Sequence, residues 1–194
     1  MKLIFVFEGG DRIGKKTQTK MLLSRLLLSN YAASSYEVPV DDHVTYPLIY
    51  WMLENGLAKR RPNVFQLVQF FNKFLFQVIL WWRLQWSDAV ILDRWALSSI
   101  AYGDNTGANK LLTRVLLFFM MKPTLTLVLD GPRRTRESDD VYESDNELQR
   151  RVRESYRSLA QTEPYTLLID ASGSRAEVHE RIVSIVSYFL PRIA

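Results

Sequence analysis

The residues best suited to chemistry form a glycine-bearing loop near the start of the chain, between an apolar run and a helical pattern. This loop has the G-x-x-x-x-G-K spacing of a phosphate-binding loop, with Gly9 followed after four residues by Gly14 and Lys15. Glycines let the backbone turn sharply and aim N–H groups at an anion, and the following helix adds the positive end of its dipole. Lys15 adds a full charge that can reach the outer phosphates. The loop therefore predicts a nucleoside-triphosphate site.

One position of this loop departs from the usual pattern. The residue after the lysine is normally Ser or Thr, whose hydroxyl holds Mg²⁺, but here it is Lys16. Thr17 comes next, but one step along a helix rotates a side chain by about 100°, so it does not substitute directly. Two interpretations stay open. Either Lys16 contacts a phosphate while Mg²⁺ is held by phosphates and by Asp93 through water, or the chain is a weakened or inactive kinase.

The elements that must position this loop alternate along the chain. Apolar strand-like runs are predicted at 3–7, 34–38, 89–92, 125–129 and 165–169, and helical patterns at 15–28, 46–53, 63–86, 110–121, 139–160 and 175–190. This alternation predicts a three-layer α/β fold of the P-loop NTPase type, with a parallel five-stranded sheet and helices on both faces. We expect one domain, 1–194, with a short lid at about 131–145. The strand ends Glu8, Asp93, Asp130 and Asp170 are expected on one rim, where such sheets bind ligands.

Composition narrows the classes of function. The chain has 194 residues, a net charge of +4 and no cysteine, which excludes disulfides and thiolate metal sites. The charge suits an anionic ligand but is too small to argue for nucleic acid. Only seven residues precede Glu8, too few for a secretory signal, so we expect a soluble, cytoplasmic protein. Polar residues interrupt the apolar segment 64–82, which is therefore read as a buried or interface helix instead of a membrane span.

Four stretches together carry a family resemblance. FEGGDRIGKKTQ, ILDRWALSSIAYG, VYESDNELQRRVRESYRSLA and IDASGSRAEVHERI follow one another in the order seen in the thymidylate kinase family, over nearly the whole chain. The resemblance implies transfer of the terminal phosphoryl group of ATP to dTMP, with Mg²⁺, on a parallel-sheet core. It also implies a homodimer, and helix 63–86, apolar nearly all round, is the expected interface.

The resemblance assigns roles to matching positions. Lys15 matches the lysine on the donor phosphates, and Arg12 the loop arginine that supplies a catalytic cation. Asp93 matches the acid near Mg²⁺, and Arg94 the arginine on the acceptor phosphate. These four form the predicted catalytic set. The implied ATP-binding residues are Gly9, Gly10, Asp11, Arg12, Ile13, Gly14, Lys15, Lys16, Thr17, Arg133 and Arg136. The implied acceptor-binding residues are Asp11, Pro39, Gln69, Lys73, Arg94, Ser98, Tyr102 and Tyr142.

The acceptor side departs from the family pattern. Gln69 stands where the family stacks a Phe on the base, and Lys73 where it reads the base with an arginine. Arg and Lys are not equivalent in planar, bidentate contacts. The alternatives are therefore another pyrimidine monophosphate, such as dUMP, dCMP or a modified base, or a catalytically silent nucleotide-binding homologue. A nucleic-acid-binding module is disfavoured, because the aromatic residues are not arranged as an exposed stacking platform.

Overall fold

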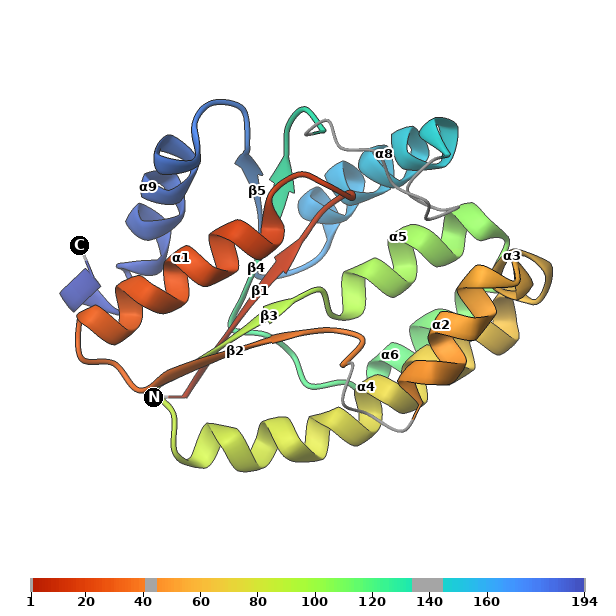
Figure 1. Ribbon diagram of the computed structural model, residues 1–194, viewed down its shortest axis with the longest axis horizontal. Helices are drawn as coiled ribbons and strands as arrows, with labels where there is room; N and C mark the ends of the chain where they lie inside the picture. The colour runs from red at the N-terminus through yellow and green to blue at the C-terminus, as the bar shows by residue number, and fades with distance from the viewer. Residues whose placement is uncertain (1, 41–44, 134–144, 194) are drawn as a thin grey trace.

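Five parallel strands form the central sheet of the computed structural model, which describes residues 2–40, 45–133 and 145–193 (Figure 1). Their order is β2-β3-β1-β4-β5. The strands are β1 (Leu3–Glu8), β2 (Ala33–Glu37), β3 (Ala89–Asp93), β4 (Leu125–Asp130) and β5 (Thr166–Asp170). The predicted α/β fold with a parallel five-stranded sheet is confirmed. The chain leaves β1 for the edge strand β2, and later crosses to β4 on the other side of β1. This change of direction makes the carboxyl end of β1 the expected ligand-binding point.

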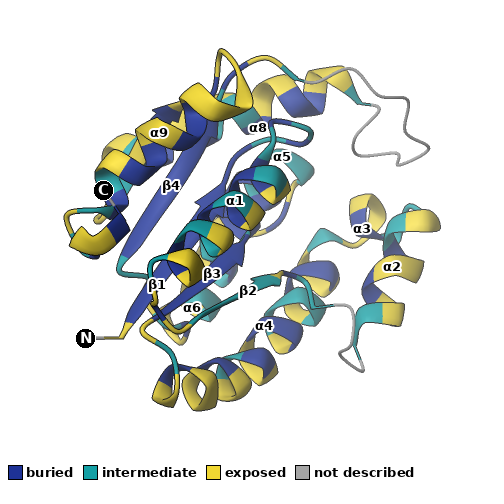
Figure 2. Ribbon diagram, turned by 60° about the vertical axis from the view of Figure 1, so that its left-hand side comes forward, coloured by how far each residue is buried: buried dark blue, intermediate teal, exposed yellow. Residues whose placement is uncertain are grey.

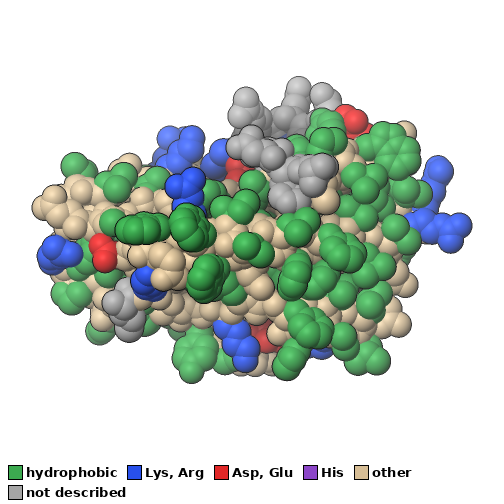
Figure 3. Space-filling view, turned by 90° about the horizontal axis from the view of Figure 1, so that it is seen from below, with side chains coloured by type: hydrophobic (Ala, Val, Ile, Leu, Met, Phe, Trp, Pro, Cys, Tyr) green, Lys and Arg blue, Asp and Glu red, His purple; other side chains and the backbone are tan. Residues whose placement is uncertain are grey.

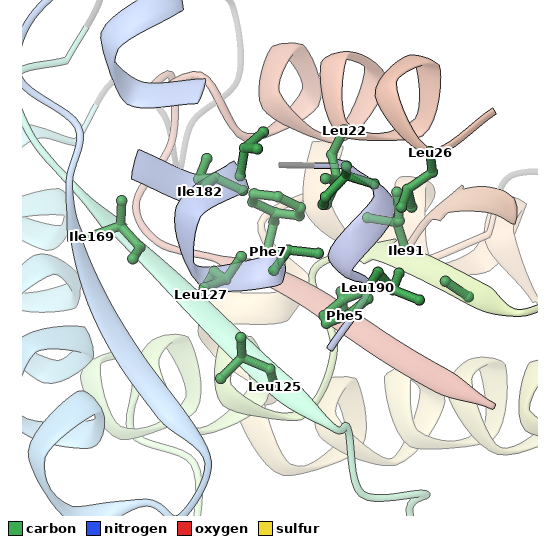
Figure 4. Close-up of a cluster of buried hydrophobic side chains, with 14 of the residues drawn as sticks. Phe5, Phe7, Leu22, Leu26, Ile91, Leu125, Leu127, Ile169, Ile182 and Leu190 are labelled. Carbon is green, nitrogen blue, oxygen red and sulfur yellow. The ribbon is translucent and has the colours of Figure 1, made fainter. Parts of the chain in front are cut away.

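Alternation along β1 sends its side chains to two different cores. Leu3, Phe5 and Phe7 are buried in a cluster with residues of α1 (Lys15–Leu28) and α9 (Arg175–Val186) (Figure 4). Ile4 and Val6 point to the opposite face and pack in a second cluster with residues of α4 (Pro62–Gln85). Both faces of the central strand are thus covered by helices, as a buried parallel sheet requires.

The face of the sheet that α4 covers also carries the helices around the predicted site. Buried residues of several of these helices join in a third cluster (Figure 2). The helices besides α4 are α2 (Tyr46–Glu54), α3 (Leu57–Arg60), α5 (Ala96–Thr106), α6 (Lys110–Phe118) and α8 (Asn146–Thr162).

Several predicted boundaries were wrong for local reasons. Of the helix expected over 139–160, residues 139–144 lie outside the described residues; α8 begins at Asn146, because Asp145 has extended dihedrals and its side chain accepts from the backbone N–H of Leu148. The strand expected from 165 begins at Thr166, because Tyr165 has a left-handed φ of 54°. The helix expected to reach 121 ends at Phe118, and the one expected to reach 190 ends at Val186. The short helix α3 was not predicted, and α5 lies in the stretch ILDRWALSSIAYG that carries the resemblance, outside the predicted helical patterns.

Candidate active site

The phosphate-binding loop connects β1 to α1 and depends on its glycines. Gly9 has a φ of 131°, and a Cβ there would lie 2.5 Å from the carbonyl oxygen of Leu129, so only glycine fits. Gly14 has a φ of 98° and caps α1 in a left-handed conformation. The Lys15 Nζ donates to the carbonyl oxygens of Gly9, at 3.1 Å, and of Gly10, at 2.6 Å. The Lys15 side chain therefore folds back over the loop in which a phosphate would bind.

Burial strongly affects the charge of Lys15. Its side chain is buried, and desolvation together with the nearby Arg94 guanidinium lowers its pKa to about 8. The carboxylates of Asp93 and Asp11 act in the opposite direction. Bound phosphates would raise this pKa again, so the lysine is poised to gain from an anionic ligand.

Asp11 sits at the centre of a buried polar network. Its carboxylate accepts from the guanidinium of Arg94, from the Tyr102 hydroxyl at 2.6 Å and from the Gln149 amide at 2.7 Å. Gln149 also accepts from the Asp11 backbone N–H at 3.2 Å. Burial opposes the charge on Asp11, but Arg94 and Lys15 outweigh it and lower the pKa of the carboxyl to about 2. Asp11 was predicted for both substrates, and its side chain lies on the acceptor side.

Arg94 follows directly after β3 and is held from two directions. It has a left-handed φ of 70°, and its backbone N–H donates to the carbonyl oxygen of Phe7. Its guanidinium lies 5.3 Å from the centre of the Tyr102 ring. Burial opposes its charge, but Asp11 raises the pKa of Arg94 well above the ordinary value. The arginine is a fixed, permanently charged group, not an exposed partner of a surface ion pair.

A cavity of about 270 Å³ opens beside this network. It lies between the end of β2, the N-terminal half of α4, and helices α2 and α5. Its lining includes Asp11, Pro39, Gln69, Lys73, Arg94, Ser98 and Tyr102. The structure thus gathers the predicted acceptor-binding residues around one cavity, apart from Tyr142, which lies outside the described residues.

Lys73 gives one wall of this cavity a buried positive charge. The side chain is 1% exposed and its Nζ donates to the Ser99 Oγ at 2.5 Å. Burial lowers the pKa of Lys73 to about 8, against the opposing attraction of Glu8. Two aromatic residues on the same helix do not line the cavity: Phe70 packs against the core and Phe71 is 54% exposed. Neither ring is therefore placed to stack on a base in this cavity.

Three charges meet where β2 and β3 end beside α1. Glu37 and Asp93 are paired in register on neighbouring strands. The Lys16 Nζ lies 2.5 Å from a carboxylate oxygen of Glu37. Burial raises the pKa of Asp93, while Lys15 and Arg94 act to lower it. The Lys16 side chain is thus directed toward Glu37 at the carboxyl edge of the sheet. Carboxylate oxygens beside a phosphate-binding lysine are a donor set that fits Mg²⁺, which is usually held by one or two carboxylates plus phosphates.

Glu8 does not lie on the rim as expected. It shares a face with Ile4 and Val6, is fully buried, and desolvation raises its pKa. Its carboxylate accepts from the backbone N–H groups of Trp95, at 2.7 Å, and Ser98, at 3.2 Å, and from the Tyr156 hydroxyl at 3.0 Å. The glutamate thereby fixes the start of α5, the segment next to Arg94. Strict alternation along β1 was the sequence signal for this position.

The remaining predicted donor residues divide into three groups. The Ile13 side chain is buried in the core, so only its backbone can face a nucleotide. Arg12 lies half-buried in the loop with a left-handed φ of 63°, and Thr17 is half-buried on α1. Arg133 donates to the Asn146 side chain at 3.0 Å, at the foot of the predicted lid. Arg136 and most of the expected lid lie outside the described residues.

Residues that sequence reasoning missed complete the site. Gln149 on α8 holds Asp11, Ser99 on α5 holds Lys73, and Glu37 pairs with Lys16. All three are polar residues far in sequence from their partners, so only the packing of helices α1, α4, α5 and α8 with the sheet brings them together.

A phosphate-binding loop at the carboxyl end of β1, beside a cavity whose lining includes an ordered arginine, defines a P-loop nucleoside monophosphate kinase. The family model "Thymidylate kinase" matches residues 7–182. The chain therefore belongs to the thymidylate kinase family, whose members are phosphotransferases that act on dTMP.

Relatives agree with this assignment over almost the full length of the chain. The chain is 31% identical to a thymidylate kinase of Synechococcus sp. (strain JA-3-3Ab), over 95% of each chain. It is 26% identical to that of Plasmodium falciparum, over 94% of this chain and 88% of the relative. The structure of the Candida albicans thymidylate kinase matches with a TM-score of 0.79 at 21% identity, covering 98% of this chain and 93% of that one. At that identity the structural match supports the fold.

Proposed function

We propose that this site transfers the terminal phosphoryl group of ATP to dTMP, giving dTDP and ADP. An oxygen of the acceptor phosphate forms the new bond to the γ-phosphorus, and the bond to the β–γ bridging oxygen breaks. One observation carries the proposal: the cavity of about 270 Å³ has Arg94 in its wall, and the charges of Arg94 and Lys15 act on each other across the end of β1. Phosphoryl transfer depends mainly on positioning and on neutralising charge where two anions meet.

On the donor side, the loop N–H groups and Lys15 receive the phosphates of ATP. The Lys15 Nζ leaves the carbonyl oxygens of Gly9 and Gly10 and binds the outer phosphates. Arg12, in the same loop, adds a second cation toward the transferred group. The lid arginines Arg133 and Arg136 are proposed to approach the donor when the lid closes, which excludes water from the reaction.

On the acceptor side, Arg94 binds the monophosphate while Asp11 holds the guanidinium in place. The base of the acceptor is proposed to bind at the other end of the cavity. The Lys73 ammonium can only donate hydrogen bonds, so it favours a base that presents a carbonyl oxygen. Gln69 can donate and accept. Gln69, which stands where the family stacks a Phe, also supports the second candidate, another pyrimidine monophosphate with a carbonyl oxygen at that edge, such as dUMP.

Mg²⁺ is proposed as the metal that accompanies ATP. It would neutralise charge on the β- and γ-phosphates. Asp93, buried at 6% exposure at the end of β3 beside Lys15, is proposed to hold it through water. Lys16 supplies no hydroxyl, so the protein's share of the metal site rests on carboxylates.

The exposed side of α4 supports a homodimer. Leu75, Val78, Trp81, Trp82 and Trp86 are each at least 43% exposed, and Figure 3 shows hydrophobic side chains spread over this face. Within the described residues α4 is also the helix long and apolar enough to cross a membrane, with a mean hydropathy of 1.3. Its other side, however, packs into the core. We therefore propose a second copy of the chain as its partner, with no membrane or nucleic-acid partner, in the cytoplasm where nucleotides are made.

Transfer of label from [γ-³²P]ATP to dTMP tests the proposal. Lys15→Met should lower the transfer rate by about a thousandfold or more, because it removes a charge from the transition state. Lys20→Met, an exposed lysine on the same helix, is the matched control and should leave the rate unchanged. If the wild-type protein binds ATP but transfers no label to dTMP, the proposal is contradicted and a catalytically silent homologue is favoured.

A further inference from the structure

The ion pair between Lys16 and Glu37 joins two elements that carry different halves of the site. Lys16 is the second residue of α1, immediately after the phosphate-binding lysine. Glu37 is the last residue of β2 and also lines the acceptor cavity. Their charged atoms lie 2.5 Å apart, with side chains 66% and 58% exposed. An exposed pair of this kind contributes little to folding, about 0–1 kcal/mol, so stability alone does not account for it.

Glu37 is also the in-register neighbour of Asp93. In a parallel pair, residues in register point to the same side of the sheet, so both carboxylates lie on one side of its carboxyl edge. Burial and the neighbouring Glu37 raise the pKa of Asp93, whereas Lys15, Arg94 and Lys16 lower it. Two neighbouring carboxylates repel unless a cation lies between or beside them. In the structure Lys16 is the cation beside Glu37, and Lys15 and Arg94 are the stronger cations acting on Asp93.

The phosphate-binding loop places the usual position of a divalent cation in the same region. Lys15 acts electrostatically on Asp93 and lies next to Lys16 in the chain. A hard divalent cation binds carboxylate oxygens and phosphate oxygens together. The side chain that normally offers a hydroxyl there is a lysine, which offers no acceptor. The Glu37 carboxylate at the end of β2 can therefore supply the oxygen ligand that the loop lacks.

We propose that Glu37, together with Asp93, holds the divalent cation of the bound nucleotide, and that Lys16 is a tethered ammonium that occupies the carboxylate until the metal arrives. This inference rests on the proposed nucleotide site. Lys16 and the metal compete for Glu37, so the lysine weakens metal binding in the free enzyme. Once displaced, its ammonium is on the first turn of α1, beside the nucleotide phosphates.

Direct binding measurements test this without turnover. The affinity for ADP is measured by calorimetry with and without Mn²⁺, and the ratio gives the tightening that the metal supplies. Glu37→Gln should reduce this ratio about fivefold or more, because the amide removes a charged ligand. Lys16→Met should increase it by a similar factor, because the competing ammonium is gone. Loss of structure cannot produce that increase.

Two exposed residues provide matched controls. Glu54→Gln on α2 and Lys20→Met on α1 should leave the ratio at the wild-type value. The inference is overturned if the ratio is unchanged in Glu37→Gln or lowered in Lys16→Met. In that case, normal ADP binding and label transfer would still leave the proposed function intact. Failure of wild-type protein to bind ADP at all would contradict both.

Discussion

The buried pair of Asp11 and Arg94 should affect stability and catalysis in separable ways. Replacing Arg94 with Met leaves the Asp11 carboxylate buried, with the neutral donors Tyr102 and Gln149 and the more distant charge of Lys15. Removing one partner of a buried pair typically costs about 3–5 kcal/mol. The fall of the Asp11 pKa from 3.8 to about 2 corresponds to about 2 kcal/mol of stabilisation, with Arg94 its largest favourable cause. We expect Arg94→Met to lower the free energy of unfolding by about 2–4 kcal/mol.

A double-mutant cycle provides the assay. Unfolding in urea at pH 7 is measured for Arg94→Met, Asp11→Asn and the double variant. The double variant should recover at least about 1.5 kcal/mol relative to the sum of the single changes, because it no longer buries an unpaired charge. Phosphoryl transfer should not recover, because the acceptor phosphate has lost its cation, and the loss should stay near a thousandfold or more.

The pH dependence gives the same pair a second readout. A carboxyl with a lowered pKa stabilises the fold above about pH 4, and that contribution is lost as the pH falls from about 4 toward 2. The stability difference between wild type and Arg94→Met should therefore be largest near neutral pH and shrink in acid. Additive effects of the two substitutions, or recovered transfer in the double variant, would refute this reasoning.

Three further outcomes are expected. Glu8→Gln should gain stability relative to wild type as the pH rises above about 4.5, because burial raises the pKa of Glu8 and its charged form disfavours folding. Thermal melts of both proteins from pH 5 to 8 check this. A difference in melting temperature that stays constant over this range would contradict it. The KM for dTMP should rise as the pH passes about 8, where Lys73 loses its proton, and Lys73→Met should remove that rise in initial-rate measurements; a persisting rise would implicate another group. Trp82→Glu should shift sedimentation from dimer to monomer, whereas a wild-type monomer at micromolar concentration would remove the interface from the account.

Local rules predicted the framework of the site well. The apolar run of β1, the loop spacing and the helical period of α1 each follow from neighbours in sequence, and the structure forms the expected strand, loop and helix there. The parallel sheet follows from the alternation of elements. Because parallel strands end at one edge, Asp93 and Arg94 were also expected beside the loop, and Arg94 bonds to Asp11 as part of that arrangement.

Long-range polar pairing was harder to predict. Gln149 lies 138 residues from Asp11, and nothing in its local sequence distinguishes this buried residue from a surface glutamine. Glu8 was placed on the rim because it ends an apolar run, whereas the alternation of β1 directs it under α5. Lys16 was recognised as a departure, but its partner Glu37 depends on how β2 docks beside β3. In each case the partner is set by packing of distant elements.

The most direct test of the account is a coupled ADP-release assay with ATP across a panel of nucleoside monophosphates, with and without Mg²⁺. The account predicts Mg²⁺-dependent turnover with dTMP, and lower turnover with dCMP, whose amino group meets the donor-only Lys73. Turnover with no member of the panel, in protein that still binds ATP, would contradict the central claim that this site is a working kinase.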